Sequence, residues 1–124
     1  MFKRLDFRVN ISKFQIPIFS SQLEKAREAT DLANARAAYA EIVTASLTDG
    51  DKPTDTATVT YNKTTADGKS TYTAVVKLTQ KTPGWTTADA EKSVASIQSN
   101  GSPTAGGTCT ITVAGNGTVT VEYK

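Results

Sequence analysis

Few residues in this chain have side chains that commonly do chemistry. Its 124 residues include no His and one Cys. Without His there is no Ser-His or Cys-His pair, no zincin helix and no His-ligated haem. One Cys builds neither a disulfide framework nor a structural zinc site. Cys109 lies in a predicted strand with no cationic neighbour in sequence, so we expect it to point inward as a small apolar residue. We expect no enzyme, cofactor or metal.

Two groups of carboxylates are the remaining candidates for chemistry. Asp89 and Glu91 stand together at the start of a predicted short helix. A carboxylate pair can do acid/base work, but acidic residues also favour a first helical turn, and we prefer that interpretation. Asp49, Asp51 and Asp55 alternate in a predicted loop, where they could bend the chain around Ca²⁺. Their spacing is not that of an EF-hand, so a solvated acidic loop is the expectation.

Trp85 is the best candidate for a surface contact. It lies in a predicted Thr-Pro-Gly-Trp-Thr-Thr loop. An indole on a loop could stack on a sugar or fill a groove of a neighbouring subunit. The alternative is that it folds back and closes the end of the core.

Composition indicates one α+β domain in which helix precedes sheet. The length allows a modest core, and a net charge of +2 is too weak to indicate nucleic acid or an anionic membrane surface. Ala, Leu, Glu, Lys and Arg dominate residues 17–48, whereas residues 51–124 hold 18 of the 21 Thr. Helix formers therefore precede β-branched strand formers. No run of about 18 apolar residues is present, so the chain as written is predicted to be soluble.

Residues 17–48 are predicted to form one long helix. Ser21 and Glu24 fit a capping box, Pro17 would instead suit the first turn of a slightly longer helix, and Gly50 is expected to stop it. Arg27 is spaced to pair with Glu24 and with Asp31 on the exposed side. An apolar row recurs at steps of three and four residues: Phe19, Leu23, Ala26, Thr30, Ala33, Ala37, Ala40, Thr44 and Leu47.

A second row is present only in the C-terminal part of that helix: Leu32, Tyr39, Ile42 and Val43. We therefore expect residues 32–47 to pack in the core, with Ala33, Ala37 and Ala40 against the sheet or a neighbouring helix. For residues 19–31, projection beyond the domain is the alternative.

Residues 55–124 are predicted to form a four-stranded antiparallel meander. Alternating residues in 56–62 and 70–79 flank Asp67-Gly68, and the segments 108–113 and 118–123 flank Asn116-Gly117 in the same way. Thr87 is expected to cap a short helix, Ala88 to Ile97, between the two hairpins. The apolar half of the long helix is expected to cover one face of the sheet.

Residues 17–43, from Pro17-Ile18-Phe19-Ser20-Ser21 to Ala40-Glu41 and beyond, resemble the segment after the membrane-embedded stretch of type IV pilins and pseudopilins of Gram-positive bacteria. The resemblance implies a long helix, apolar in its first half, whose second half packs on a four-stranded antiparallel sheet. It implies a structural subunit of an extracellular, cell-surface filament whose partners are other pilin subunits. The helix-packing candidates are then Phe19, Leu23, Ala26, Ala33, Ala37 and Ala40.

Residues 1–16 depart from that family, which has a basic leader, a cleavage point before a Phe, a Glu, and about 20 apolar residues. Here Leu5, Phe7, Val9 and Ile11 alternate with polar residues in a strand pattern. Either an unrelated leader replaces the apolar half of the helix, which we prefer, or an extra strand stands there. The membrane contact of the family would need the missing apolar segment, so we expect that the chain as written cannot be anchored in a bilayer.

Two functions from different classes follow. The first is a filament subunit, serving adhesion, motility, secretion or DNA uptake, which the residues do not separate. The second is a secreted Thr-rich module that holds carbohydrate with its sheet face and Trp85.

Overall fold

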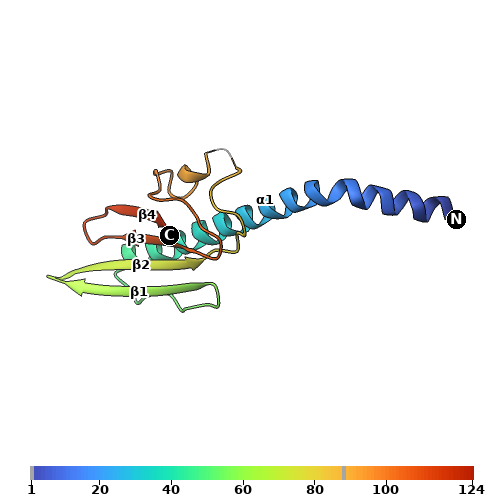
Figure 1. Cartoon of the computed structure of the whole chain (residues 1–124). Helices are drawn as coiled ribbons and strands as arrows, with labels where there is room; N and C mark the ends of the chain where they lie inside the picture. Colours follow the sequence, from blue (N-terminus) through green and yellow to red (C-terminus); the bar gives the residue numbers. More distant parts are fainter. Residues whose placement is uncertain (1, 88) are drawn as a thin grey trace.

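The structure is a computed structural model that describes residues 2–87 and 89–124, with side chains from residue 22 onward. One long helix, α1 (Phe2–Thr48), is followed by strands β1 (Val59–Ala66), β2 (Lys69–Lys77), β3 (Thr108–Val113) and β4 (Val119–Tyr123). The C-terminal half of α1 lies along the sheet, and the N-terminal half extends away from it (Figure 1). The predicted α+β arrangement, with a helix before a four-stranded antiparallel sheet, is confirmed.

The helix begins much earlier than the sequence signals predicted. It runs without interruption from Phe2 through Pro17, so the start near residues 17–21 and the extra strand within residues 1–16 are both wrong. A single strand leaves its N–H and C=O groups without partners, whereas a helix satisfies its own. The alternation in residues 5–11 is too short to overrule that requirement.

The helix ends where it was predicted to end, but a different residue makes the turn. Asp49, not Gly50, adopts the left-handed conformation, with φ of 47°. The N–H of Asp49 donates to the Ser46 carbonyl, and the N–H of Gly50 donates to the Ala45 carbonyl. These are the two hydrogen bonds of a Schellman motif. The Gly50 carbonyl then accepts the Lys63 ammonium at 2.8 Å and the Tyr72 hydroxyl at 2.6 Å, which fixes the end of α1 to β1 and β2.

The sheet is the predicted meander, in the order β1-β2-β3-β4 with every neighbour antiparallel. Asp67 and Gly68 both have positive φ, as a two-residue type I′ hairpin turn requires. Alternation sends Val59 and Tyr61 into the core and leaves Thr60 exposed. Side chains on the other face include Thr73, Thr110 and Thr120, so much of that face is lined with hydroxyl groups.

The core lies between α1 and one face of the sheet, as predicted. The helix contributes Ala35, Ala38, Ile42 and Ala45. The strands contribute mostly larger residues, with Ala74 as the exception: Val59, Tyr61, Tyr72, Ala74, Val76, Cys109, Ile111, Val113, Val121 and Tyr123. Small residues on the helix let its backbone approach the sheet closely, and the aromatic and β-branched residues of the strands fill the space.

The segment between the hairpins contains less helix than predicted. In place of the helix Ala88 to Ile97 there is a single 3-10 turn, η1 (Ala90–Lys92), and Ala88 lies outside the described residues. Ala95 and Ser96 both have positive φ, a conformation that ends any helix. Val94 is buried, so packing on the core prevails over helix propensity here.

Among the described residues, no helix is both long enough and apolar enough to cross a membrane.

Candidate functional site

The described part of α1 has two different faces. The residues of the predicted apolar row that the structure describes are exposed, and we call them the exposed row: Leu23, Ala26, Thr30, Ala33, Ala37, Ala40, Thr44 and Leu47. The buried row is Glu24, Glu28, Asp31, Ala35, Ala38, Ile42 and Ala45. Both rows advance by alternating steps of three and four residues. At 100° per residue, their centres are on roughly opposite sides of the helix.

Core packing within residues 32–47 was expected to include Ala33, Ala37 and Ala40, and this is wrong because all three are exposed. Packing of these residues against a neighbouring helix, the other expectation, stays a prediction. Of the second predicted row, Leu32 and Ile42 are buried. The packing candidate Phe19 has its side chain outside the described residues.

The exposed row carries apolar surface to solvent. Among the side chains that the structure describes, two large hydrophobic residues are exposed, Leu23 at 39% and Leu47 at 82%. Both belong to the exposed row, one at each end. The row advances by an average of 3.5 residues, the spacing of a coiled-coil seam, so a partner helix could follow it by winding around α1 in a left-handed supercoil.

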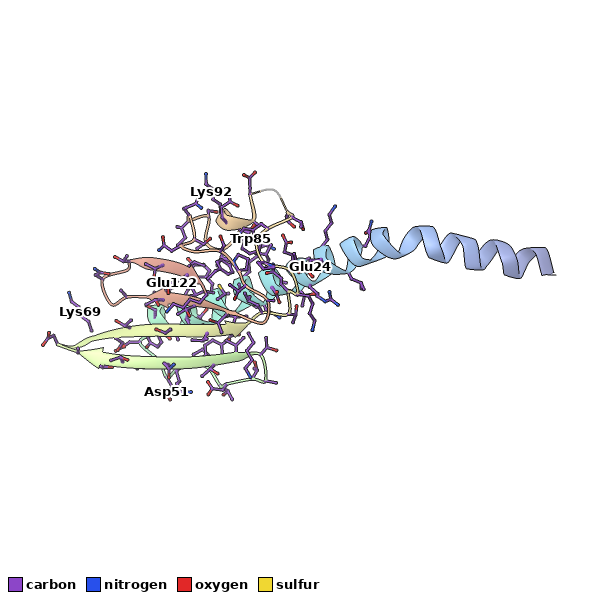
Figure 2. The ribbon with its side chains drawn as sticks, viewed as in Figure 1. Glu24, Asp51, Lys69, Trp85, Lys92 and Glu122 are labelled. Atoms are coloured by element: carbon purple, nitrogen blue, oxygen red, sulfur yellow. The ribbon has the colours of Figure 1, made fainter. Side chains whose placement is uncertain are left out.

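Three carboxylates begin the buried row, and they bind one loop. Glu24, Glu28 and Asp31 are 7%, 0% and 1% exposed. Residues 79–87, which follow β2 and which we call the strap, donate backbone N–H groups to all three. Figure 2 shows Glu24 and Trp85 where α1 leaves the sheet. The strap therefore binds the part of α1 that is leaving the sheet.

Asp31 binds the start of the strap. Its Oδ1 accepts the N–H of Thr79 at 2.8 Å and the Thr79 hydroxyl at 2.8 Å, and its Oδ2 accepts the N–H of Gln80 at 3.1 Å. Two consecutive backbone N–H groups and a hydroxyl thus surround one buried carboxylate. Charge-assisted bonds of this kind are about twice as strong as neutral ones.

Glu24 binds the middle of the strap. Its Oε1 accepts the N–H groups of Lys81 at 3.0 Å and of Thr82 at 3.1 Å. Its Oε2 is 3.3 Å from Nη1 of Arg27. The predicted Glu24–Arg27 ion pair is therefore confirmed. Glu24 does not form the predicted capping box, because its carboxylate accepts N–H groups of the strap.

Glu28 binds the end of the strap. Its Oε1 accepts the N–H of Thr87 at 2.8 Å, and its Oε2 accepts the N–H of Thr86 at 3.0 Å and the Thr86 hydroxyl at 2.6 Å. Burial alone would raise the pKa of this carboxyl, but the hydrogen bonds from Thr86 and Thr87 outweigh burial, and the pKa lies below its ordinary value. Glu28 is accordingly held in its charged form.

This cluster was not predicted from the sequence. Asp31 was expected on the exposed side, paired with Arg27, and this is wrong because Asp31 faces the strap. The signal was the spacing of Glu24, Glu28 and Asp31, which continues the steps of the buried row. A search for apolar periodicity does not recognise this row as buried, because its first three members are acidic.

Trp85 lies within the strap and is half-buried. Its ring packs edge to face with that of Tyr123, 4.9 Å between centroids, and contacts the core. Trp85 therefore folds back on the end of the core, which was the alternative expected from the sequence. Part of the indole still reaches solvent.

The acidic loop after α1 uses its carboxylates for local structure. Asp55 accepts the N–H of Tyr61 at 2.8 Å and lies 3.2 Å from the Lys52 ammonium, and these two groups lower its pKa. Asp49 accepts the hydroxyl of Ser70. The side chains that the structure describes contain no group of three or more His, Cys, Asp or Glu residues arranged to hold a metal.

Cys109 is fully buried in β3, and burial raises its pKa to about 11. Its side chain points inward, as expected. Asp89, exposed with φ of 56°, and the half-exposed Glu91 lie at η1. The N–H of Ser99 donates to the backbone carbonyl of Glu91, so this part of the chain acts as a structural turn.

A groove of about 490 Å³ separates α1 from the loop before β1. Its walls are Asn34, Ala37, Ala38, Glu41, Pro53, Thr54, Thr56, Thr58, Val59 and Tyr61. The groove adjoins the exposed row through Ala37.

No family model, curated protein or solved structure matched the chain.

Proposed function

We propose that this chain is a structural subunit of an extracellular filament of the type IV pilin or pseudopilin kind, and that α1 is its assembly element. The observation that carries the proposal is the division of α1 between two faces. One face packs on the sheet and the strap, and the other presents the exposed row to solvent. The small residues of the exposed row would let a partner helix approach α1 closely, and Leu23 and Leu47 would supply apolar contacts at its ends.

The shape of the molecule supports this role. A helix of 47 residues is about 70 Å long, more than twice what the sheet can cover. Its N-terminal half extends beyond the sheet (Figure 1). A filament could bundle such helices in its centre and display the sheet domains on its surface, as the resemblance of residues 17–43 implies.

Sequence at the start of the gene provides the first test. We expect the genomic region to encode about 20 apolar residues directly before Pro17, in the reading frame that continues into the helix. A genomic sequence without them at this place would refute a pilin of the ordinary kind.

Filament assembly provides the second test. In cells that produce filaments from the natural gene, Ala37→Glu should abolish filaments sheared from the surface, because it places a charge in the exposed row. Thr60→Glu, on the exposed face of the sheet, adds the same charge and should leave filaments intact. Both isolated domains should keep their circular dichroism spectra. Normal filament numbers with Ala37→Glu would contradict assembly through this face.

The alternative, a secreted Thr-rich module that binds carbohydrate, rests on Trp85 and on the hydroxyl-lined face of the sheet. The contact of the Trp85 ring with Tyr123 leaves less of the indole for a sugar. Binding on a glycan array that Trp85→Phe greatly weakens would favour it, whereas binding to no glycan would count against it.

A further inference from the structure

We infer that the strap, residues 79–87, is a clamp on α1 that opens in acid and uncovers Trp85. The inference rests on how the strap is attached. Its backbone N–H groups at residues 79–82, 86 and 87 all donate to carboxylates of α1. The device is a property of the fold, with or without assembly into filaments.

Protonation of Glu28 weakens the attachment of the strap at Thr86 and Thr87. A carboxylate accepts hydrogen bonds at both oxygens, but a protonated carboxyl group places an O–H donor at one of them, facing N–H groups. A donor that loses its partner in a buried site costs free energy. Because Glu24 and Asp31 bind other parts of the same nine-residue segment, release of its Glu28 end exposes their hydrogen bonds to water.

The sign of the pH effect follows from the direction of the Glu28 pKa. Its pKa is lower in the closed clamp than in a solvated strap, because Thr86 and Thr87 donate to the charged form against the effect of burial. The stabilisation is therefore complete above the ordinary pKa of Glu, about 4.3, and is lost as the pH falls through the lower pKa of the closed state. The clamp is closed at neutral pH.

Other titratable groups lie near the clamp. The cationic ones are Arg27, which pairs with Glu24, Lys81 within the strap, and Arg36, whose charge acts to lower the pKa of Tyr123. Burial raises the pKa of Cys109 to about 11 and also raises the pKa of Tyr123, so both remain neutral in acid. Glu28 is therefore the group to which we assign the acid response of the clamp.

The strap carries its own reporter. Trp85 is the single Trp of the chain and lies between the attachments to Glu24 and those to Glu28. Opening would move its indole from Tyr123 into water and shift its fluorescence to the red. We expect this shift below about pH 4, while the far-ultraviolet circular dichroism of helix and sheet is retained. Fluorescence and dichroism that change in one shared transition would show acid unfolding and overturn the clamp.

Removing one attachment should change the midpoint of the fluorescence shift. Thr86→Val deletes the hydroxyl that donates to Glu28 at 2.6 Å and leaves the carboxylate in place. With fewer donors to the charged form, the closed-state pKa rises, and the midpoint should move up by about one pH unit. Thr82→Val is the matched control within the strap, because it keeps the backbone N–H that Glu24 accepts. A Thr86→Val midpoint equal to that of the control would overturn the inference.

Replacing a carboxylate tests the same attachment from the helix. Glu28→Gln should shift the Trp85 emission to the red already at pH 7, because the amide turns a donor toward the strap. Glu41→Gln, on an exposed position of α1, should leave emission and midpoint unchanged. Wild-type emission of Glu28→Gln at neutral pH would contradict the clamp. Hydrogen exchange at pH 7 separates opening from unfolding: residues 79–87 should exchange faster while β2 and β3 remain protected.

Discussion

Two adjacent alanines of α1 should respond in opposite ways to the same substitution. Ala38 is 1% exposed and lies in the core against the sheet, whereas Ala37 is exposed. Leucine adds three carbon atoms at either position. Ala38 borders the same groove as Ala37, but it is packed among core residues that the added atoms must displace, and overpacking of this kind costs about 1–3 kcal/mol. At Ala37 the new side chain meets solvent and the adjoining groove, so the change should stay within about 0.5 kcal/mol.

Thermal and urea denaturation measure the difference. For a domain of this size, a loss of 1 kcal/mol lowers Tm by roughly 3–6 °C, so Ala38→Leu should melt about 5–15 °C below the wild type. Ala37→Leu should melt within about 3 °C of it. Urea midpoints should fall in the same order at constant slope. Equal destabilisation by both variants, or a stable Ala38→Leu protein, would show that the two faces of α1 have been assigned wrongly.

Three further expectations concern the core and the turns. Ile42→Ala should lower the free energy of unfolding by about 2–5 kcal/mol, measured by urea denaturation, because Ile42 is fully buried between α1 and the sheet. Cys109 should not react with a thiol reagent at pH 8 until the protein is unfolded, since its thiol is buried and its pKa is about 11; rapid labelling of the native state would contradict this burial. Gly101→Ala should lower Tm more than Gly117→Ala. Both positions have positive φ, but a Cβ at Gly101 would clash with the Tyr123 carbonyl oxygen, whereas none of the surrounding atoms lies within 4 Å at Gly117.

The sheet could be predicted because its signals are local. Asp67-Gly68 strongly favours a two-residue hairpin turn. The strands on both sides of it alternate in polarity, and the turn together with this alternation determines their register. The position of α1 over the sheet followed from the need to cover an apolar face. These features depend on residues close together in the sequence, or on a requirement that any sheet shares.

The orientation of α1 could not be predicted in the same way. Two rows of nearly equal spacing compete in the helix, and the more apolar row lies outside. The buried row begins with Glu24, Glu28 and Asp31, whose partners are backbone N–H groups about 50 to 60 residues away. A loop offers such groups only once its conformation is known, so hydropathy alone gives the wrong face.

At both ends of the helix, local residue types predicted a backbone conformation that differs from the structure. Gly50 was the expected stop, but Asp49 takes the left-handed position and Gly50 supplies the next hydrogen bond of the motif. Upstream, an alternating pattern suggested a strand, although a helix that begins at Phe2 satisfies more of its backbone. The pilin resemblance of residues 17–43 agrees with the order of helix and sheet and remains a proposal for function.

The attachments of α1 at Gly50 and along the strap also determine how the molecule would carry a mechanical load. A pull along the axis of α1 acts at the same time on the Lys63 and Tyr72 bonds to Gly50 and on the strap bonds to its carboxylates. Bonds loaded in shear share the force and break together, whereas bonds that are peeled break one after another. These bonds thus prevent α1 from sliding along the sheet domain under a pulling force. If acid opened the strap, the Gly50 bonds and the packed core alone would bear that force.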